Sequence, residues 1–155
     1  MALFLYFNGN FDAMTLRCTL TLGYCWLALT ASAQVTGKWK TIDDETNEPK
    51  SVVEIFERDG KVYGKIVKLF RQPHEDPDPV CEECDSADER YKKKVIGMEI
   101  LRDMVKNGDE YGEGNILDPN NGKIYRCKIW LEENRLMVRG YWGPFYRTQS
   151  WLKAQ

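Results

Sequence analysis

Apolar and polar residues alternate in short runs through most of the chain beyond residue 33, and turn residues separate these runs. Alternation with a period of two is typical of β-strands that bury one face. Only residues 96–106 have a pattern that also suits a short helix. The pattern therefore predicts an all-β domain of about eight antiparallel strands. Apart from two hairpins, the expected strands cover residues 35–42, 96–101, 115–117 and 146–152.

The clearest local signal is Asp59-Gly60, because this dipeptide suits a two-residue hairpin turn with positive φ. Counting outward from the turn pairs Arg58 with Lys61 and Val53 with Ile66. One face of the hairpin is then charged and the other is apolar. The apolar face includes Val53, Ile55, Val62, Gly64 and Ile66.

A second hairpin is expected around Glu133-Asn134. The same counting places Leu131 opposite Leu136 and Tyr125 opposite Trp142, and it again leaves one face apolar. The other face combines basic residues with large apolar ones, namely Trp130, Met137 and Tyr141.

Eight antiparallel strands in sequential order lose their exposed edges most simply by closing into a single up-and-down β-barrel. A barrel of this size can hold one small ligand. The alternatives are an open sandwich and a barrel filled by its own side chains. Inward-facing Gly64 and Gly140 favour interior space, although glycine in a strand also marks bulges. The candidate ligand-binding residues are Val53, Ile55, Val62, Ile66, Tyr125, Cys127, Ile129, Leu136, Val138 and Trp142.

The composition fits one water-soluble globular domain, with 43% hydrophobic and 30% charged residues. A formal net charge of −2 provides no overall attraction to nucleic acid or to anionic lipid. The single histidine, His74, leaves little material for a histidine-rich metal site or a catalytic triad. We therefore expect no catalytic residues, no metal site and no cofactor, and we do not expect an enzyme.

Residues 1–33 have the features of a secretory signal. Arg17 provides a positive charge, residues 18–29 are apolar, and Ala31 and Ala33 occupy the positions that a signal peptidase recognises. Met14 is an alternative start. The alternative interpretation is a retained membrane anchor, although the apolar run is short for a span. We expect cleavage after residue 33, a mature domain over residues 34–155 without a stable membrane span, and a periplasmic or secreted location.

The least regular region covers residues 71–94, which contain three prolines and an acidic run. Loops of this length are usually functional or disordered. We consider three roles for it: a lid over one barrel mouth, a docking segment for another protein, and a solvated excursion held by a local crosslink.

Cys81 and Cys84 form a Cys-x-x-Cys motif in this loop. Outside the cytoplasm, a structural disulfide is the first interpretation, and closing so short a loop would contribute roughly 2 kcal/mol. A redox-active dithiol is the second, although the neighbouring glutamates disfavour a thiolate. A zinc site is the third, but it needs further ligands, of which only His74 and Cys127 are obvious. We expect Cys127 itself to be a small buried apolar residue.

A series of motifs runs through the chain beyond residue 33: Gly37-Lys38-Trp39, 59–66, Cys81-x-x-Cys84, 116–119, 122–125, 139–141 and 147–151. As a set and in this order, they resemble the bacterial domain of unknown function 2147 family. The resemblance implies an exported bacterial protein with a lipocalin-like, calycin-type barrel, associated with small hydrophobic ligands and with no established catalysis. The Gly-x-Trp motif is also similar to the lipocalin signature. It implies that Trp39 closes the barrel floor beneath Arg147 of the last strand.

The expected function is the binding or carriage of a small, lipid-like hydrophobic molecule inside the barrel. The first alternative is an envelope structural or protein-interaction module with a filled barrel and an envelope protein as partner. The second is a thiol redox protein that cycles Cys81 and Cys84.

Overall fold

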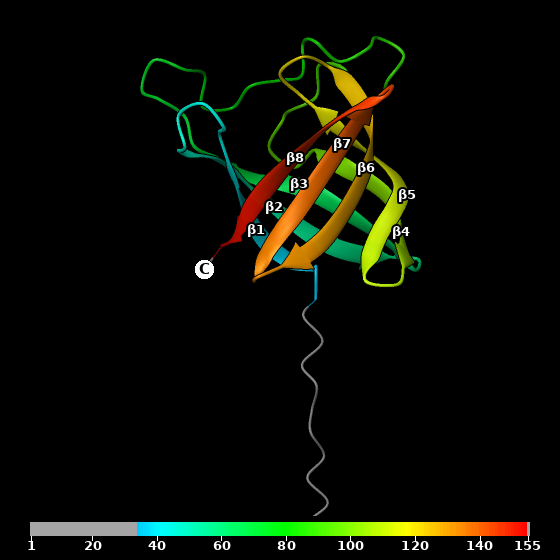
Figure 1. Cartoon of the computed structure of the whole chain (residues 1–155). Helices are drawn as coiled ribbons and strands as arrows, with labels where there is room; N and C mark the ends of the chain where they lie inside the picture. Colours follow the sequence, from blue (N-terminus) through cyan, green and yellow to red (C-terminus); the bar gives the residue numbers. More distant parts are fainter. Residues whose placement is uncertain (1–33, 155) are drawn as a thin grey trace, which may run out of the picture. The chain divides into compact units, whose positions relative to one another are not determined.

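The computed structural model describes residues 34–154, so the expected signal segment and the alternative start at Met14 lie outside the described residues. The strands close into one antiparallel barrel in sequence order (Figure 1). They are β1 (Gly37–Ile42), β2 (Pro49–Arg58), β3 (Lys61–Leu69), β4 (Glu99–Asn107), β5 (Glu110–Asp118), β6 (Lys123–Glu132), β7 (Arg135–Trp142) and β8 (Phe145–Lys153). The prediction of an all-β, eight-stranded antiparallel barrel is confirmed. Within residues 34–154, no helix is long and apolar enough to cross a membrane.

The two hairpin registers follow from local turn chemistry, and both match the prediction. Arg58 pairs with Lys61 and Val53 with Ile66 in the β2–β3 hairpin. Leu131 pairs with Leu136 in the β6–β7 hairpin. The expected pairing of Tyr125 with Trp142 lies beyond that ladder, which ends at Arg126 and Tyr141.

Most of the segment that also suited a helix is strand β4, which begins at Glu99 and ends at Asn107, later at both ends than the predicted residues 96–101. A bulge explains the misleading pattern: Leu101 pairs with Gly64 and Met104 with Val62, so the two apolar residues stand three apart on one face. Asp103, with a φ of 57°, lies inside this bulge. The β4–β5 hairpin was missed, although its two-residue turn is the recognisable sequence Gly108-Asp109.

The barrel has two unlike ends. At one end, here called the floor, short turns at residues 59–60, 108–109 and 133–134 join the strands. At the other end, here called the mouth, the connections cover residues 43–48, 70–98, 119–122 and 143–144. Figure 1 shows the longer loops gathered at this end.

Trp39 is buried at the floor end of the barrel, and Arg147 does not cover it. The indole is 2% exposed and donates from Nε1 to the Val35 carbonyl at 2.7 Å. The cation over its ring is Lys153, whose Nζ lies 4.4 Å from the ring centroid. The register explains this correction, because Trp39 pairs with Lys153, whereas Arg147 pairs with Gly140 toward the mouth.

Candidate functional site

Most of the candidate ligand-binding residues fill the barrel instead of lining an open space. Those with relative exposures of 0–4% are Val53, Ile55, Val62, Ile66, Cys127, Ile129, Leu136 and Val138. They belong to one hydrophobic core together with Trp39 and Trp151. The expectation that these residues line an open cavity is therefore wrong, because their surfaces pack against one another.

The two inward-facing glycines have opposite surroundings. A Cβ atom on Gly64 would lie 2.7 Å from Ile55 Cδ1 and 3.1 Å from Leu101 Cβ, so Gly64 accommodates neighbouring core side chains. A Cβ atom on Gly140 would meet Tyr125 at an ordinary contact distance of 3.6 Å. Of the two glycines, only Gly140 could carry a Cβ atom without a clash, and it lies toward the mouth.

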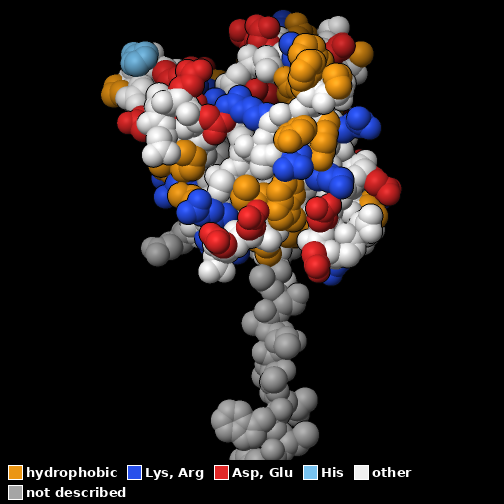
Figure 2. Space-filling view, in the orientation of Figure 1, with side chains coloured by type: hydrophobic (Ala, Val, Ile, Leu, Met, Phe, Trp, Pro, Cys, Tyr) orange, Lys and Arg blue, Asp and Glu red, His pale blue; other side chains and the backbone are white. Residues whose placement is uncertain are grey.

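Aromatic side chains remain exposed at this end of the barrel. Trp142 is 69% exposed and Phe145 is 67% exposed, and the two rings lie 6.2 Å apart across the β7–β8 turn. Because side chains alternate along a strand, Trp142 shares the inward face of Gly140, and Phe145 shares that of Arg147. Figure 2 shows apolar and basic side chains together over the ends of β7 and β8.

Polar side chains complete the mouth. Arg147 and Gln149 alternate with the buried Trp151 along β8 and share its face. Both side chains donate to Asp44 Oδ2 from the β1–β2 connection, Gln149 at 3.1 Å. Tyr125, which shares the inward face of Cys127 on β6, accepts from Asn121 Nδ2 at 3.4 Å. We define the mouth residues as Asp44, Tyr125, Gly140, Trp142, Phe145, Arg147 and Gln149.

Sequence reasoning placed only Tyr125 and Trp142 of these residues in the binding site. The alternation of Phe145, Arg147, Gln149 and Trp151 could have identified the β8 residues. Asp44 carried no usable signal, because its contacts join residues more than a hundred positions apart.

The outer face of the last strands holds an arginine between two aromatic rings. The Arg139 guanidinium carbon lies 5.0 Å from the Trp130 ring centroid and 4.6 Å from that of Tyr146. Its Nε donates to Thr148 Oγ1 at 2.7 Å. The apolar residues of this face are half-buried by their neighbours on the same sheet; they are Trp130, Met137 and Tyr141.

Cys81 and Cys84 form a disulfide, as the first interpretation of this motif predicted. Their relative exposures are 0% and 4%, which hinders attack by an external thiol. The bond also occupies both sulfurs that a zinc site would need as thiolates. Among residues 34–154, no group of three metal-ligating side chains comes together.

Backbone hydrogen bonds hold the disulfide-bonded part of the long loop in a defined conformation. Val80 and Lys94 form an antiparallel bridge, and Cys81 exchanges backbone hydrogen bonds with Lys92 and Lys93. Cys81 also lies against the β5–β6 turn, with Sγ 3.6 Å from the Pro119 carbonyl oxygen. Residues 80–95 therefore pack on the barrel, which argues against a wholly solvated excursion.

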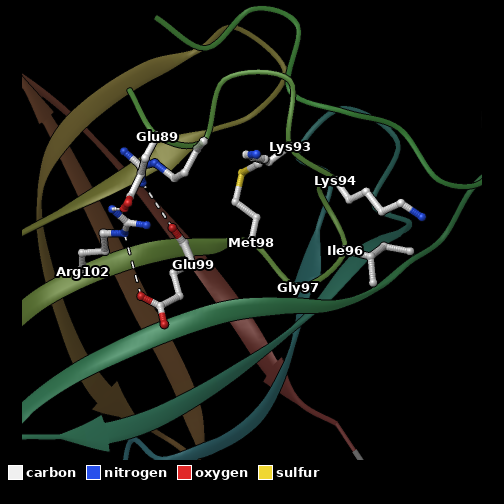
Figure 3. A pocket seen from close by; sticks show the side chains of 9 residues that line it. Glu89, Lys93, Lys94, Ile96, Gly97, Met98, Glu99 and Arg102 are labelled. Atoms are coloured by element: carbon white, nitrogen blue, oxygen red, sulfur yellow. Dashed lines mark hydrogen bonds and ion pairs between the residues drawn. The ribbon is translucent and has the colours of Figure 1, made fainter. Parts of the chain in front are cut away.

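Ion pairs hold the same loop to β4. Arg90 is 5% exposed; its Nη2 donates to Asp88 Oδ2 at 2.6 Å and its Nη1 to the Glu99 carbonyl at 3.2 Å. Hydrogen bonds from Arg90 lower the pKa of Asp88 to about 2. Arg102 Nη1 donates to Glu89 Oε1 at 2.6 Å, so a second pair joins β4 to the loop (Figure 3).

Two hollows stand out on the described surface. The first, of about 490 Å³, lies between the loop and the start of β4, where Arg102 and Glu99 face Lys93 and Met98 (Figure 3). Glu99 takes a bidentate pair from Arg58, which lowers the pKa of Glu99. Most charges around this hollow are already paired: Arg102 with Glu89 and Glu99, and Arg90 and Lys94 with Asp88 and Asp78 outside it. Such pairing is typical of a structural network.

The second hollow, of about 380 Å³, lies on the wall near a β5 bulge, beside Arg126, Lys128 and Tyr141. Cys127 also contributes to it. Burial raises the pKa of the Cys127 thiol to about 12, so the reactive thiolate is scarce near neutral pH. This agrees with the expectation of a small buried apolar residue.

Comparison with known proteins agrees with this architecture. Residues 37–153 match the family described as "Uncharacterized protein conserved in bacteria (DUF2147)". The chain belongs to this family. The match covers every strand of the barrel, so the DUF2147 domain and the described fold coincide. No curated protein matches the chain.

A solved structure supports the fold of this DUF2147 chain. It is protein HP1028 from the human pathogen Helicobacter pylori, which its title assigns to the lipocalin family. The TM-score is 0.66 at 20% sequence identity, over 79% of this chain and 84% of that one. This similarity shows a lipocalin-like fold.

Proposed function

We propose that this protein is exported and that the mouth of its barrel binds a small molecule with a substantial apolar part. The observation that carries the proposal is the contrast between the packed barrel core and the exposed aromatic corner at the β7–β8 turn. The core is packed even toward the mouth, where Leu101 and Leu117 are buried, whereas inward-facing Trp142 and Phe145 remain largely exposed. A side chain at Gly140 would meet Tyr125 only at an ordinary contact distance.

Exposed aromatic side chains at the edge of an apolar core offer a surface that a ligand can cover. Burying about 200 Å² of apolar ligand surface would contribute roughly 5 kcal/mol before the costs of association. The ligand would lie across the mouth, above the packed core, and not deep within the barrel.

The export part of the proposal rests on residues 17–33 and on the disulfide. The sequence there has the order of a secretory signal, and disulfides persist mainly in oxidising compartments. Cleavage after Ala33 would release a chain that begins at Gln34. The intact mass of protein recovered from the cell envelope or the medium tests this directly.

Native mass spectrometry of protein exported with its own signal tests the binding proposal. We expect an adduct that survives native conditions and disappears on denaturation. Gly140→Val places a branched side chain in the mouth and should remove the adduct. Gly112→Val is the matched control, because a Cβ at Gly112 would meet only the flexible Lys128 side chain, at 3.7 Å. Persistent absence of an adduct, even after addition of envelope lipids, would refute the proposal.

A second candidate function is an envelope protein-interaction module. The packed core favours it, because the core side chains fill the barrel interior that they line. Its contact surface would be the outer face around Trp130, Met137 and Tyr141. Crosslinking in the envelope, with Trp130→Ala against wild type, distinguishes the two: this candidate predicts loss of a specific partner, whereas mouth binding predicts an unchanged adduct.

A further inference from the structure

Two donors on β8 converge on one oxygen atom at the mouth. Arg147 Nη2 and Gln149 Nε2 both donate to Asp44 Oδ2. Asp44 comes from the β1–β2 connection, so the acceptor and its donors lie on separate segments of the barrel. A guanidinium and an amide that meet at a carboxylate oxygen form a geometry suited to carboxylates in general.

We propose that Arg147 and Gln149 recognise the carboxylate head group of an amphipathic ligand, and that the Asp44 carboxylate competes with that head group for the same donors. The inference rests on the proposed function, because it concerns the polar side of the same mouth. It adds the chemical class of the ligand, which is an aliphatic or aromatic carboxylate.

Arg147 has donors to spare for a second acceptor. A guanidinium presents five N–H groups, and the contact with Asp44 engages its Nη2. The Arg147 side chain is 68% exposed, so the remaining donors can be reached from the mouth. A ligand carboxylate can therefore bind beside Asp44 or replace it.

The mouth carries charges of both signs, because the β1–β2 connection holds Asp43, Glu45 and Glu48 beside Asp44. Lys123 Nζ lies 5.9 Å from the Trp142 ring centroid, which places a second positive charge at the rim. The nearby Asp118 carboxylate accepts from the side-chain amides of Asn120 at 2.7 Å and Asn121 at 3.1 Å, so it is already hydrogen-bonded. Asp43 likewise accepts from the backbone N–H groups of Glu45 and Thr46 and pairs with Lys50. Asp44 is the carboxylate that Arg147 and Gln149 contact, so it is the one that a ligand must displace.

Polar and apolar groups lie in the order that an amphipathic molecule requires. Arg147 pairs with Gly140 across β7 and β8, and Gly140 pairs with Cys127 across β6 and β7. Gly140 thus lies between the arginine and the apolar wall of the core. A head group at Arg147 would leave its apolar part against Tyr125 and Trp142.

Decanoate and 1-decanol test this assignment, because they share a chain length and differ at the head group. Their dissociation constants can be measured by tryptophan fluorescence below the micellar range. We expect decanoate to bind wild-type protein about tenfold more tightly, in line with a charge-assisted hydrogen bond. Arg147→Gln should abolish this preference. Arg139→Gln, which removes an arginine from the outer face, should retain it.

Asp44→Asn tests the competition itself. The substitution keeps an acceptor oxygen but removes the negative charge, so we expect decanoate affinity to rise several-fold, by roughly three to ten times. Weaker decanoate binding in this variant would overturn the competition, and a preference that survives Arg147→Gln would overturn the assignment. Equal binding of the two probes to wild type would overturn this inference alone, whereas binding of neither would overturn the proposed function as well.

Discussion

Lys153, on the last strand, lies over the indole of Trp39, on the first, with Nζ 4.4 Å from the ring centroid. The same ammonium donates to the Thr36 carbonyl at 3.3 Å. Gly37 accommodates it, because a Cβ atom at that position would lie 3.0 Å from Nζ. This contact joins the two strands that close the barrel, and it takes the place expected for Arg147.

Lys153→Gln should therefore lower the free energy of unfolding by about 0.5–1 kcal/mol, through loss of the cation–π contact. Arg147→Gln is the matched control, because its exposed ion pair with Asp44 should change that free energy by less than about 0.5 kcal/mol. Urea unfolding followed by tryptophan fluorescence measures both. A larger loss for Arg147→Gln than for Lys153→Gln would contradict this ranking of the two contacts.

Gly122 determines how the long loop packs on the β5–β6 turn. A Cβ atom there would lie 1.7 Å from the Glu83 carbonyl oxygen, and φ is +66°. Gly122→Ala should displace the loop and cost more than about 2 kcal/mol, from backbone strain combined with lost packing.

Gly108→Ala separates the two causes, because Gly108 has a φ of +62° and no atom lies within 4 Å of the position that its Cβ would take. It should cost only about 1 kcal/mol. Hydrogen exchange should accelerate across residues 80–95 in Gly122→Ala and stay unchanged in Gly108→Ala. Equal effects of the two substitutions would mean that the loop does not depend on this contact.

The Asp88–Arg90 pair predicts a specific loss of stability in acid. The pKa of Asp88 is lowered from 3.8 to about 2, so its ionised form favours the folded state. That stabilisation is fully present above about pH 4 and is lost as the pH falls through 2. Asp88→Asn should lower the unfolding free energy near neutral pH by about 1–2 kcal/mol and flatten its pH dependence in this window.

Glu89→Gln is the control for this measurement, because the Glu89 side chain is 74% exposed. Its surface pair should contribute less than about 0.5 kcal/mol. Unfolding free energies measured from pH 2 to pH 7 compare the variants. An unchanged pH dependence of the unfolding free energy in Asp88→Asn would show that the Asp88–Arg90 pair does not stabilise the fold.

The Cys81–Cys84 disulfide should stabilise the loop without being required for the barrel. Replacing both cysteines with serine should cost roughly 2 kcal/mol while the far-ultraviolet circular dichroism remains that of a β-protein. The buried sulfurs also predict slow reduction of the folded wild type by glutathione. Rapid reduction without unfolding would instead support the thiol redox alternative.

The sequence predicted best those parts of the fold that depend on neighbouring residues. Asp59-Gly60 determines its own turn, and alternation then determines which residues of β2 and β3 face inward. The same reasoning failed at β4, because the bulge at Asp103 gives Leu101 and Met104 the spacing of a helix. A bulge adds one residue to the pattern, and periodicity alone cannot distinguish that change from helical spacing.

The candidate site was harder to predict, because it depends on volume and on distant contacts. Alternation identified Ile129 and Leu136 as inward-facing, but whether such residues line or fill a barrel depends on how their volumes add up. The contact between Asp44 and Arg147 joins opposite parts of the sequence. Its position follows only from the closed barrel.

Binding at the mouth is the central claim, and a titration with 1-decanol followed by amide NMR tests it most directly. We predict saturable shift changes in residues 123–127 and 138–149, which border Gly140 and Trp142, and unchanged spectra along residues 89–102. Gly140→Val should suppress these changes. Shifts concentrated in residues 89–102, or no saturable shifts at any residue, would contradict binding at the mouth.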